Sequence, residues 1–413
     1  MNNLGKLLWS KKPYFVFSLA TLLSGIGTAF STVAVYGEFA IHNVSPIFYS
    51  LAFLLSVAPG LIASVFAGKY ANKLNIALVL VSAEVVGGLS LIVPIIGLTS
   101  EKIVFLLFAE FIGSALTGFL IPFHRSLIRR TFSDEELASI SVYEVYIFTA
   151  TFLLGQALGT LIYSFVGALI FFQIDFLTYL FASILIFWAS RMSPDNFRAL
   201  EGNDSDIRTF RWRELNTIQK RVFMIMPLLS LVCSPSMSLL PARGAEFGIS
   251  INYGAIVLAP ALFFLLLKTV GQLIGPQIIE VVDIDKLVDS NWVTITCLGG
   301  FLVFYYIVFT TDIFWLAAVS VVFAHILSNI VYIIASYGLS RHFSEVAIAS
   351  ASAKSYQFTV LSMTISGFLA GIIAEVSSLL IVVGVSLLPL MLITVHLYKQ
   401  SYQKVEGIEI NEI

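Results

Sequence analysis

Charged residues are scarce in this chain. Only 12% of its 413 residues are Asp, Glu, Lys or Arg, whereas 58% are hydrophobic and the mean hydropathy is +0.93. Soluble domains carry about 25% charged residues, so the composition excludes a soluble globular protein, whose surface needs more charge. Disorder is excluded as well, because it requires low hydrophobicity and a large net charge, and the net charge here is −2. The composition therefore indicates an integral membrane protein.

Cysteines and catalytic motifs are scarce too. The 2 cysteines, Cys233 and Cys297, both lie inside apolar runs, where we expect small core residues and no disulfide scaffold. The sequence contains neither G-x-x-x-x-G-K-S/T nor H-E-x-x-H, and no Cys/His cluster with metal-ligand spacing. We therefore expect that the chain is not an enzyme and that it has no cofactor and no metal site.

Long apolar runs fill most of the sequence. A membrane-spanning helix needs about 20 apolar residues. Twelve runs have this character, at 14–37, 47–68, 76–97, 103–127, 138–165, 168–190, 221–241, 253–279, 287–309, 313–338, 347–373 and 378–398. The first run is too long for a signal peptide, so we interpret it as a retained span. Because the runs do not alternate as barrel strands do, we predict an all-α integral membrane protein with twelve transmembrane helices.

A single long polar stretch divides these spans into two sets of six. We predict an N-terminal six-helix bundle at 1–190, a linker at 191–220 and a C-terminal six-helix bundle at 221–413. Lys and Arg gather in the linker and in the loops on its side, whereas the opposite loops contain only Lys102 and Arg243. Short loops rich in Lys and Arg stay in the cytoplasm, so we expect both termini and the linker to be cytoplasmic.

The two sets of spans resemble each other. Shifting the chain by 211 residues places Arg130 on Arg341 and Asp134 on Glu345, in the turn between the fourth and fifth spans of each half. Parallel halves of this kind are typical of transporters, in which the substrate site lies between the halves near the midplane of the membrane. The repeat predicts that architecture here.

Several motifs are similar to those of one transporter family. The loop Gly68–Asn75 reads G-K-Y-A-N-K-L-N and resembles the G-x-L-A-D-R-x-G/D loop of the major facilitator superfamily. The stretches 112–115, 133–138 and 173–180 are similar to the branch that contains macrolide efflux proteins and the enterobactin exporter. The resemblance implies the major facilitator fold and secondary active transport. We assign the conformational loops to Gly68, Lys73, Arg130 and Arg341.

The chain departs from the family pattern in three places. Asn72 replaces the acidic residue of the first loop, and Glu110 stands where many relatives have an arginine that is linked with proton coupling. In the fifth span, residues 155–160 resemble a weakened form of the antiporter G-P-x-x-G-G element. There Gly155 and Gly159 permit close helix packing, either for antiport or as general membrane packing.

Charged side chains inside the apolar runs are the strongest functional signal, because burying a charge in a bilayer is costly. Glu110 is the first candidate for proton coupling, followed by Asp175, Glu84 and His325. Glu84 also fits a structural hydrogen bond, and His325 also fits a buried core histidine. Lys268 requires a partner, which is either a protein carboxylate such as Glu110 or Asp175, or an anionic group of the substrate.

Six residues are candidates for contacts with the substrate: Lys268, Tyr36, Glu144, Tyr146, Lys354 and Phe358. Glu144 and Lys354 lie near the ends of their spans, so they also fit side chains that extend toward the membrane surface. The three aromatic residues lie on spans that line the cavity in the family, although each also fits simple packing.

These features predict a secondary active transporter in the bacterial cytoplasmic (inner) membrane. It exports a small amphiphile, either a siderophore or a drug-like molecule, in antiport with protons by alternating access. The alternatives are an importer or lipid-handling transporter of the same fold and, from another class, a non-transporting membrane receptor or scaffold. Buried charges disfavour a scaffold, which gains nothing from them. The expected partners are the solute, protons and the lipid bilayer, with no nucleic acid, and we expect a functional monomer.

Overall fold

The structure of the chain is a computed structural model. It describes residues 2–42, 44, 46–71, 73–199, 211–247, 251–253, 256–258, 260–279, 282, 284–377, 380–392 and 394. The predicted linker is therefore described only in part. Asn72 and the C-terminal tail lie outside the described residues.

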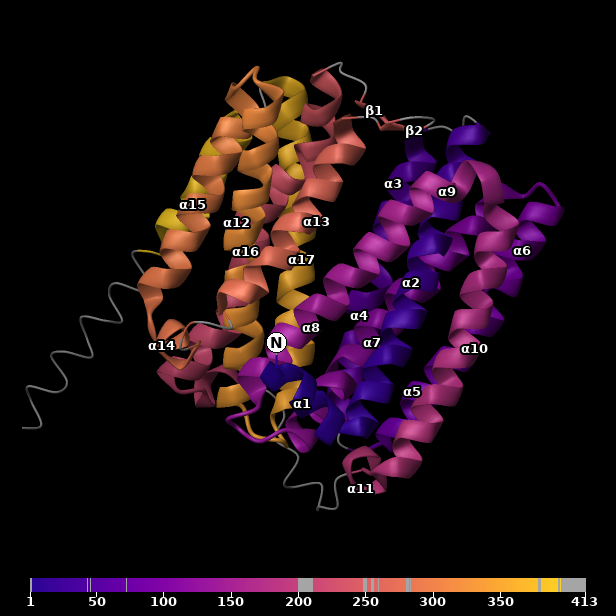
Figure 1. Ribbon diagram of the computed structural model, residues 1–413, viewed down its shortest axis with the longest axis vertical. Helices are drawn as coiled ribbons and strands as arrows, with labels where there is room; N and C mark the ends of the chain where they lie inside the picture. Colours follow the sequence, from indigo (N-terminus) through magenta and orange to yellow (C-terminus); the bar gives the residue numbers. More distant parts are fainter. Residues whose placement is uncertain are drawn as a thin grey trace, which may run out of the picture. The chain divides into compact units, whose positions relative to one another are not determined.

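Helices make up nearly all of the described structure (Figure 1). Among the residues that the structure describes, 9 helices are long and apolar enough to cross a membrane. Two shorter apolar helices, Phe263–Ile279 and Leu380–Leu392, coincide with the predicted runs at 253–279 and 378–398. The predicted all-α, multi-pass membrane architecture is confirmed.

The chain forms two compact units. Unit 1 comprises Met1–Lys220 and Tyr337–Phe358, and unit 2 comprises Arg221–Ser336 and Thr359–Ile413. Three helices therefore contribute to both units: α12 (Thr217–Glu246), by its first turn, α16 (Phe314–His342) and α17 (Ile348–Val376). The predicted bundles at 1–190 and 221–413 stay a prediction. The turn that joins α16 to α17 belongs with unit 1.

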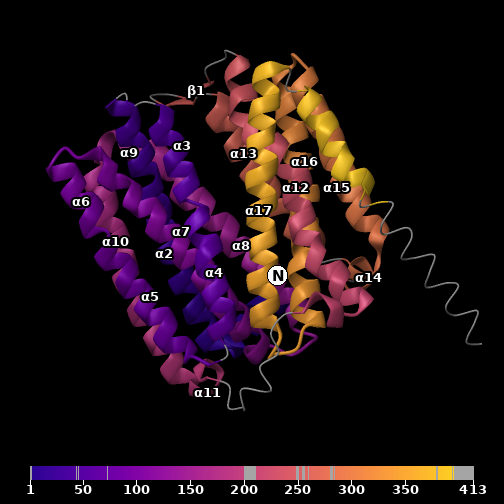
Figure 2. The same cartoon turned by 180° about the vertical axis from the view of Figure 1, so that it is seen from behind.

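Most of the described helices lie in unit 1. They are α1 (Asn2–Ser10), α2 (Lys12–Ile41), α3 (Pro46–Leu55), α4 (Ala58–Tyr70), α5 (Ile76–Ser90), α6 (Ile92–Thr99), η1 (Ile103–Leu106), α7 (Leu107–Thr131), α8 (Leu137–Thr151), η2 (Phe152–Ala157), α9 (Leu158–Val166), α10 (Ala168–Met192), α11 (Pro194–Phe197) and η3 (Trp212–Glu214). Helix α2 packs along α10 and also contacts α7 and α8, and α5 packs against α10 as well (Figures 1 and 2).

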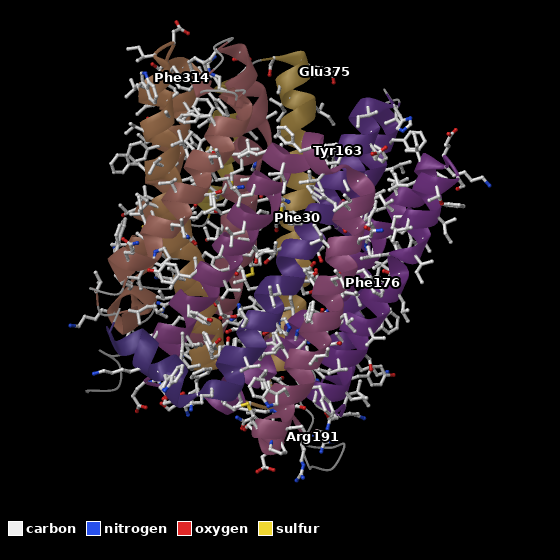
Figure 3. The ribbon with its side chains drawn as sticks, turned by 45° about the vertical axis from the view of Figure 1, so that its right-hand side comes forward. Phe30, Tyr163, Phe176, Arg191, Phe314 and Glu375 are labelled. Atoms are coloured by element: carbon white, nitrogen blue, oxygen red, sulfur yellow. The ribbon has the colours of Figure 1, made fainter. Side chains whose placement is uncertain are left out.

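Aromatic side chains join α2 to its neighbours in unit 1. Phe30 stacks on Phe171 of α10 with ring centroids 4.9 Å apart, and Tyr163 of α9 meets the same ring edge-on at 5.7 Å. Figure 3 shows Phe30 and Tyr163 in the same part of unit 1, with Arg191 at the far end of α10. Buried aromatic pairs of this geometry stabilise helix contacts beyond the area that they bury.

Three predicted spans are less regular than the apolar pattern indicates. The run at 47–68 forms two helices, α3 and α4, because Pro59 in the first turn of α4 cannot continue the hydrogen bonds of α3. The run at 138–165 contains the π-helical turn η2 between α8 and α9. The run at 253–279 begins later than predicted, since β1 (Ile251–Tyr253) and β2 (Ile256–Leu258) form a short antiparallel hairpin before α13.

Unit 2 is built on α12 (Thr217–Glu246), α13 (Pro260–Ile279), α14 (Ile284–Asp289), α15 (Asn291–Thr310) and most of α16. Helices α13 and α16 approach closely at two glycines. A Cβ at Gly271 would lie 2.4 Å from the carbonyl oxygen of Val322, and one at Gly275 would lie 3.0 Å from Cβ of Asn329. This G-x-x-x-G spacing on α13 allows the two backbones to meet.

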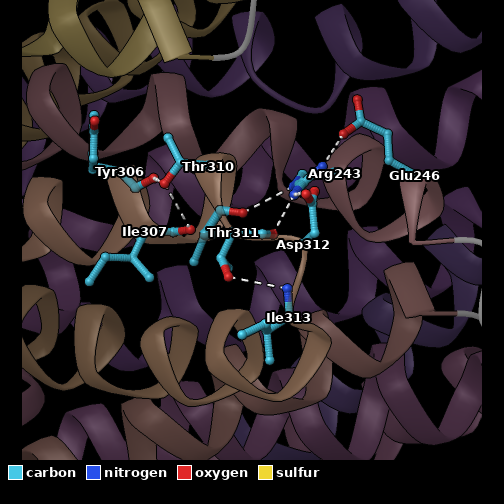
Figure 4. A network of polar contacts seen from close by, with 9 residues as sticks. Arg243, Glu246, Tyr306, Ile307, Thr310, Thr311, Asp312 and Ile313 are labelled. Atoms are coloured by element: carbon cyan, nitrogen blue, oxygen red, sulfur yellow. Dashed lines mark hydrogen bonds and ion pairs between the residues drawn. The ribbon is translucent and has the colours of Figure 1, made fainter.

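Arg243 connects the end of α15 to α12 in unit 2 (Figure 4). Its guanidinium donates to the carbonyl oxygens of Val308 at 3.0 Å and Thr311 at 2.6 Å, and it pairs with Glu246 at 2.6 Å. The last carbonyls of a helix lack partners within the helix, so the cation satisfies groups that would otherwise be unpaired. This contact gives Arg243 a structural role.

Candidate functional site

One face of α2 carries a row of hydroxyl groups. Ser24, Thr28, Ser31 and Thr32 have helical spacing and extend over about 12 Å at 1.5 Å per residue. Each of them contacts a polar side chain from another helix of unit 1. Thr28, for example, shares a hydrogen bond of 3.1 Å with the hydroxyl of Tyr179 on α10. Helix α2 therefore supplies the polar partners in an otherwise apolar interior.

Asp175 on α10 is the most deeply buried acid of this group, with 1% of its surface exposed. Ser31 donates a short hydrogen bond to its Oδ2, and Thr178 donates to its Oδ1 at 3.3 Å. Gly27 of α2 lies against the same carboxyl, because a Cβ there would be 2.5 Å from Oδ1 of Asp175. The missing side chain brings α2 close enough to α10 for the contact between hydroxyl and carboxyl.

Two more acids contact α2 in the same way. Glu84 on α5 is 7% exposed and hydrogen-bonds with Ser24, and Glu110 on α7 is 6% exposed and hydrogen-bonds with Thr32. Tyr36, one turn further along α2, lies within electrostatic range of Glu110. Oε2 of Glu84 and Oε1 of Glu110 are buried and have no hydrogen-bond partner. Three helices thus each direct one acid toward a hydroxyl of α2.

These three acids lie where a negative charge is poorly solvated. An ionised carboxylate inside a bilayer is costly unless it is paired, hydrated or neutralised by a proton. The structure gives each acid a neutral hydroxyl as its partner, and no ion pair is described for any of the three. Glu84 and Asp175 also lie within electrostatic range of each other, so a charge on one opposes a charge on the other. The arrangement is suited to binding and releasing protons.

The two turns that the internal repeat relates meet in unit 1. Arg130 pairs with Glu345 at 3.2 Å, and Arg341 pairs with Asp134 at 2.5 Å. Each turn therefore supplies one cation and one acid to the other, as the offset of 211 residues would place them. Arg129 also pairs with Asp134, at 2.6 Å. Although burial alone would raise the pKa of Asp134, its hydrogen bonds and its attraction to the two arginines dominate and lower it below the ordinary value.

The three predicted loop and packing glycines all lie at close helix contacts in unit 1. A Cβ at Gly68 would be 2.6 Å from Cβ of Ala353 on α17, and a Cβ at Gly155 would be 2.4 Å from Cβ of Ala29 on α2. Gly159 also faces α2, where an added Cβ would be 2.9 Å from the ring of Phe30. At each position, a larger side chain would push two helices apart.

A second polar cluster lies in unit 2 and carries basic groups. His325 on α16 is fully buried, and its Nε2 shares a hydrogen bond of 2.9 Å with the hydroxyl of Tyr305 on α15. Its Nδ1 is buried without a hydrogen-bond partner. Lys268 on α13 lies within electrostatic range of His325, and no hydrogen bond or ion pair is described for its ammonium. The carboxylate partner that the sequence offered for Lys268 is therefore not described.

The other predicted substrate contacts are more dispersed. Glu144 pairs with Arg125 at 2.7 Å, and Lys354 is exposed and donates to Gln357 at 3.0 Å. Phe358 is 46% exposed. Tyr36 lies edge-on to Phe39, and Tyr146 is on α8. Lys73 lies in the turn that follows α4, the helix that contains Gly68. These residues do not gather into one described cluster.

Sequence reasoning missed the neutral partners of the charged residues. Ser24, Ser31 and Thr32 were not among the candidates, although their spacing marks one face of the first span. Tyr305 was also missed, and nothing in the sequence distinguishes it from the many other aromatic residues. Among the described residues, no group of three or more His, Cys, Asp or Glu side chains is placed to hold a metal ion.

No protein-family model and no curated protein matches the sequence. Solved structures of similar fold include a bacterial homologue of the iron transporter ferroportin in an outward-facing state, with a TM-score of 0.71, 16% identity, and coverage of 94% of this chain and 99% of that one. The human organic anion transporter MFSD10 matches with a TM-score of 0.63, 14% identity, and coverage of 93% and 99%.

The E. coli fucose:proton symporter FucP, a major facilitator superfamily transporter, matches with a TM-score of 0.62, 11% identity, and coverage of 91% of this chain and 96% of that one. These likenesses extend over nearly the whole chain at low sequence identity. Together with the multiple spans described above, they show that the chain has the fold of the major facilitator transporters.

Proposed function

We propose that the chain is a secondary transporter that exports a small amphiphilic solute, a siderophore or a drug-like compound, in exchange for protons. The observation that carries this proposal is the set of three buried acids, Glu84, Glu110 and Asp175, each held by a hydroxyl of α2. Acids in such surroundings are expensive to keep charged. A transporter that alternates between two protonation states makes use of that cost, whereas a passive scaffold does not.

In this proposal, protonation of the three acids changes the charge inside unit 1, while their hydrogen bonds with the hydroxyls of α2 are kept. A hydroxyl donates a hydrogen bond to an ionised carboxylate and accepts one from a protonated carboxyl. Each acid therefore gains or loses a proton without losing its partner. The mutual repulsion of Glu84 and Asp175 favours one negative charge over two. Glu110, on a different helix, is the first residue to test.

The proposed solute and the proposed direction of transport depend on the resemblance of the sequence to known exporters. The proteins of similar fold are a homologue of an iron transporter, an organic anion transporter and a fucose:proton symporter, so the fold alone does not select a solute. The resemblance of residues 112–115 and 133–138 to macrolide efflux proteins and the enterobactin exporter favours export from the cytoplasm of a bacterium. An orientation with both termini in the cytoplasm, and a functional monomer, complete the proposal.

The test is proton movement in proteoliposomes that contain a pH-sensitive dye. We expect erythromycin or enterobactin, supplied on one side, to drive a proton flux through the wild type. Glu110→Gln keeps the size and hydrogen bonds of the side chain but cannot titrate, so it should insert normally and reduce the flux to the level of empty liposomes. The control is Glu101→Gln, which removes an acid from an exposed turn and should leave the flux unchanged.

Other outcomes favour the alternatives. If Glu110→Gln transports solute with an unchanged pH dependence, Glu110 does not couple protons. Flux only in the inward direction would favour an importer, and flux of fluorescent lipids instead of the two solutes would favour a lipid-handling transporter. If the wild type moves neither protons nor any of these solutes while a ligand still binds, the protein is better explained as a receptor.

A further inference from the structure

Two basic residues lie inside unit 2, the fully buried His325 and the partly buried Lys268, and the described helices around them place no acid beside them. In the described parts of α12, α13, α15 and α16, every Asp or Glu lies at or beyond a helix end, as Glu246 does. Lys268 is the ninth residue of α13, and His325 lies well inside α16. The interior of unit 2 therefore contains Lys268, a histidine and no described carboxylate.

The packing of α13 on α16 places the two basic residues on facing surfaces. Gly271 lies three residues after Lys268, so the two share one face of α13. A Cβ at Gly271 would be 2.9 Å from Cβ of His325. One turn further along, Nδ2 of Asn329 donates a short hydrogen bond to the carbonyl oxygen of Gln272. The face of α13 that carries Lys268 is therefore the face that meets His325.

The hydrogen bond to Tyr305 leaves one nitrogen of His325 for another partner. Tyr305 and His325 are both fully buried, and they share the bond at Nε2. Phe301 lies edge-on to the imidazole with centroids 5.8 Å apart, which limits rotation of the ring. Nδ1 then remains buried with no partner. Buried polar atoms are nearly always hydrogen-bonded, so an unpaired nitrogen beside a cation marks a place for a group that is absent here.

We propose that Lys268 and His325, with Tyr305 holding the imidazole, form a subsite for the carboxylate group of an amphiphilic solute. The inference rests on the proposed function and adds to it that the transported solute is an anion. A carboxylate gives the ammonium of Lys268 a counter-charge and accepts from N–H groups. A cation would be repelled by Lys268, and a neutral solute would leave the ammonium without a counter-charge. Tyr305 acts as a positioning residue.

The first experiment needs no gradient and no transport. We measure the melting temperature of the purified protein and its affinity for hippurate, an amphiphilic carboxylate, and for hippuramide, its neutral amide. The wild type should be stabilised by hippurate and not by hippuramide, because a ligand that binds the folded state raises its stability. Lys268→Met should weaken hippurate binding by about tenfold or more, the factor that corresponds to one lost charged contact of about 1.4 kcal/mol.

The melting temperature without ligand gives an independent result. Lys268→Met removes an unpaired charge from the membrane interior, so the variant should melt at the same temperature as the wild type or higher. The matched control, Lys102→Met, removes a lysine from a turn and should change neither value. His325→Asn keeps a hydrogen-bonding side chain and should weaken hippurate binding less than Lys268→Met does.

Two outcomes would overturn the subsite. One is a Lys268→Met variant that melts below the wild type and binds hippurate equally well, because the lysine would then have a structural carboxylate partner. The other is equal binding of hippurate and hippuramide, since charge would then play no part in recognition. Because these measurements are made without a proton gradient, failure here leaves the proton-flux test of the proposed function intact, and failure of that test leaves these measurements interpretable.

Discussion

The interiors of the two units carry opposite charges. In unit 1, three acids from α5, α7 and α10 each meet a hydroxyl of α2, whereas in unit 2 the described basic residues of the interior are the buried His325 and the partly buried Lys268. The two units therefore offer different chemistry. The acids have neutral hydrogen-bond partners close by, while Lys268 and Nδ1 of His325 have none described.

We propose that the two units divide the function. In this proposal, protons bind to the carboxyls of unit 1, whose hydrogen-bond partners come from the same unit, and the solute anion binds to the basic residues of unit 2, where Lys268 has no described counter-charge. The helix contacts follow the same division, because Gly27 brings α2 to Asp175 in unit 1 and Gly271 brings α13 to His325 in unit 2.

The largest effect is expected from closing these glycine contacts. A Cβ in Gly27→Ala would lie 2.0 Å from Oγ1 of Thr178 and 3.0 Å from Cα of Asp175, so α2 and α10 must separate, at a cost of about 2 kcal/mol. The variant should melt at a lower temperature and lose proton flux while it keeps the preference for hippurate. Gly271→Ala should also melt at a lower temperature, but it should keep the proton flux and lose the preference for hippurate.

Gly371→Ala is the control for both glycine substitutions. No atom lies within 4 Å of the Cβ position at Gly371, and alanine favours a helix over glycine by about 1 kcal/mol. This variant should melt at the same temperature as the wild type or slightly higher. If Gly27→Ala and Gly271→Ala each abolished both activities, the division between the units would be wrong.

A medium effect is expected at the reciprocal ion pairs. The side chain of Arg130 is 5% exposed, and that of Arg341 is 34% exposed. Removing the buried partner leaves more unsatisfied groups, so Arg130→Ala should lower the free energy of unfolding by about 2 kcal/mol, and Arg341→Ala by about 1 kcal/mol. Chemical denaturation in detergent measures both. Equal losses would contradict the role assigned to burial.

The smallest effect is expected from the acid in the second of these pairs. The pKa of Asp134 is lowered in the folded protein from the ordinary value of 3.8. Its contribution to stability is therefore fully present above about pH 4 and is lost as the pH falls through the lowered pKa. Asp134→Asn should melt slightly below the wild type at pH 7, and the difference should shrink toward pH 3. Glu135→Gln, next to it in the turn, is the control.

The sequence was sufficient for the membrane architecture and for one site. Continuous apolar runs can hardly do anything other than span a bilayer, so the helices were predictable from composition. The internal repeat aligned Arg130 with Arg341 and Asp134 with Glu345, and these four residues meet as two reciprocal ion pairs. The repeat was enough to single out these four residues, because it relates the whole turn around Arg130 to the whole turn around Arg341.

The sequence was insufficient where the contact depends on which helix faces which. Glu84, Glu110 and Asp175 were singled out by their charge, but their partners Ser24, Thr32 and Ser31 are small polar residues that occur throughout the chain. The separation of α3 from α4 at Pro59 and the hairpin before α13 were also missed. The mean hydropathy of a run does not reveal such breaks, because the residues on either side of each break remain apolar.

The row of hydroxyls on α2 has a consequence for how the protein can be studied. The hydroxyls of Ser24, Ser31 and Thr32 can donate to an ionised carboxylate or accept from a protonated carboxyl, so we expect titration of the three acids to leave the helix contacts of unit 1 in place. Structures of this unit determined at high and at low pH should then superimpose closely even though their charges differ. Vibrational spectroscopy of the carboxyl groups would report the protons that such coordinates do not reveal.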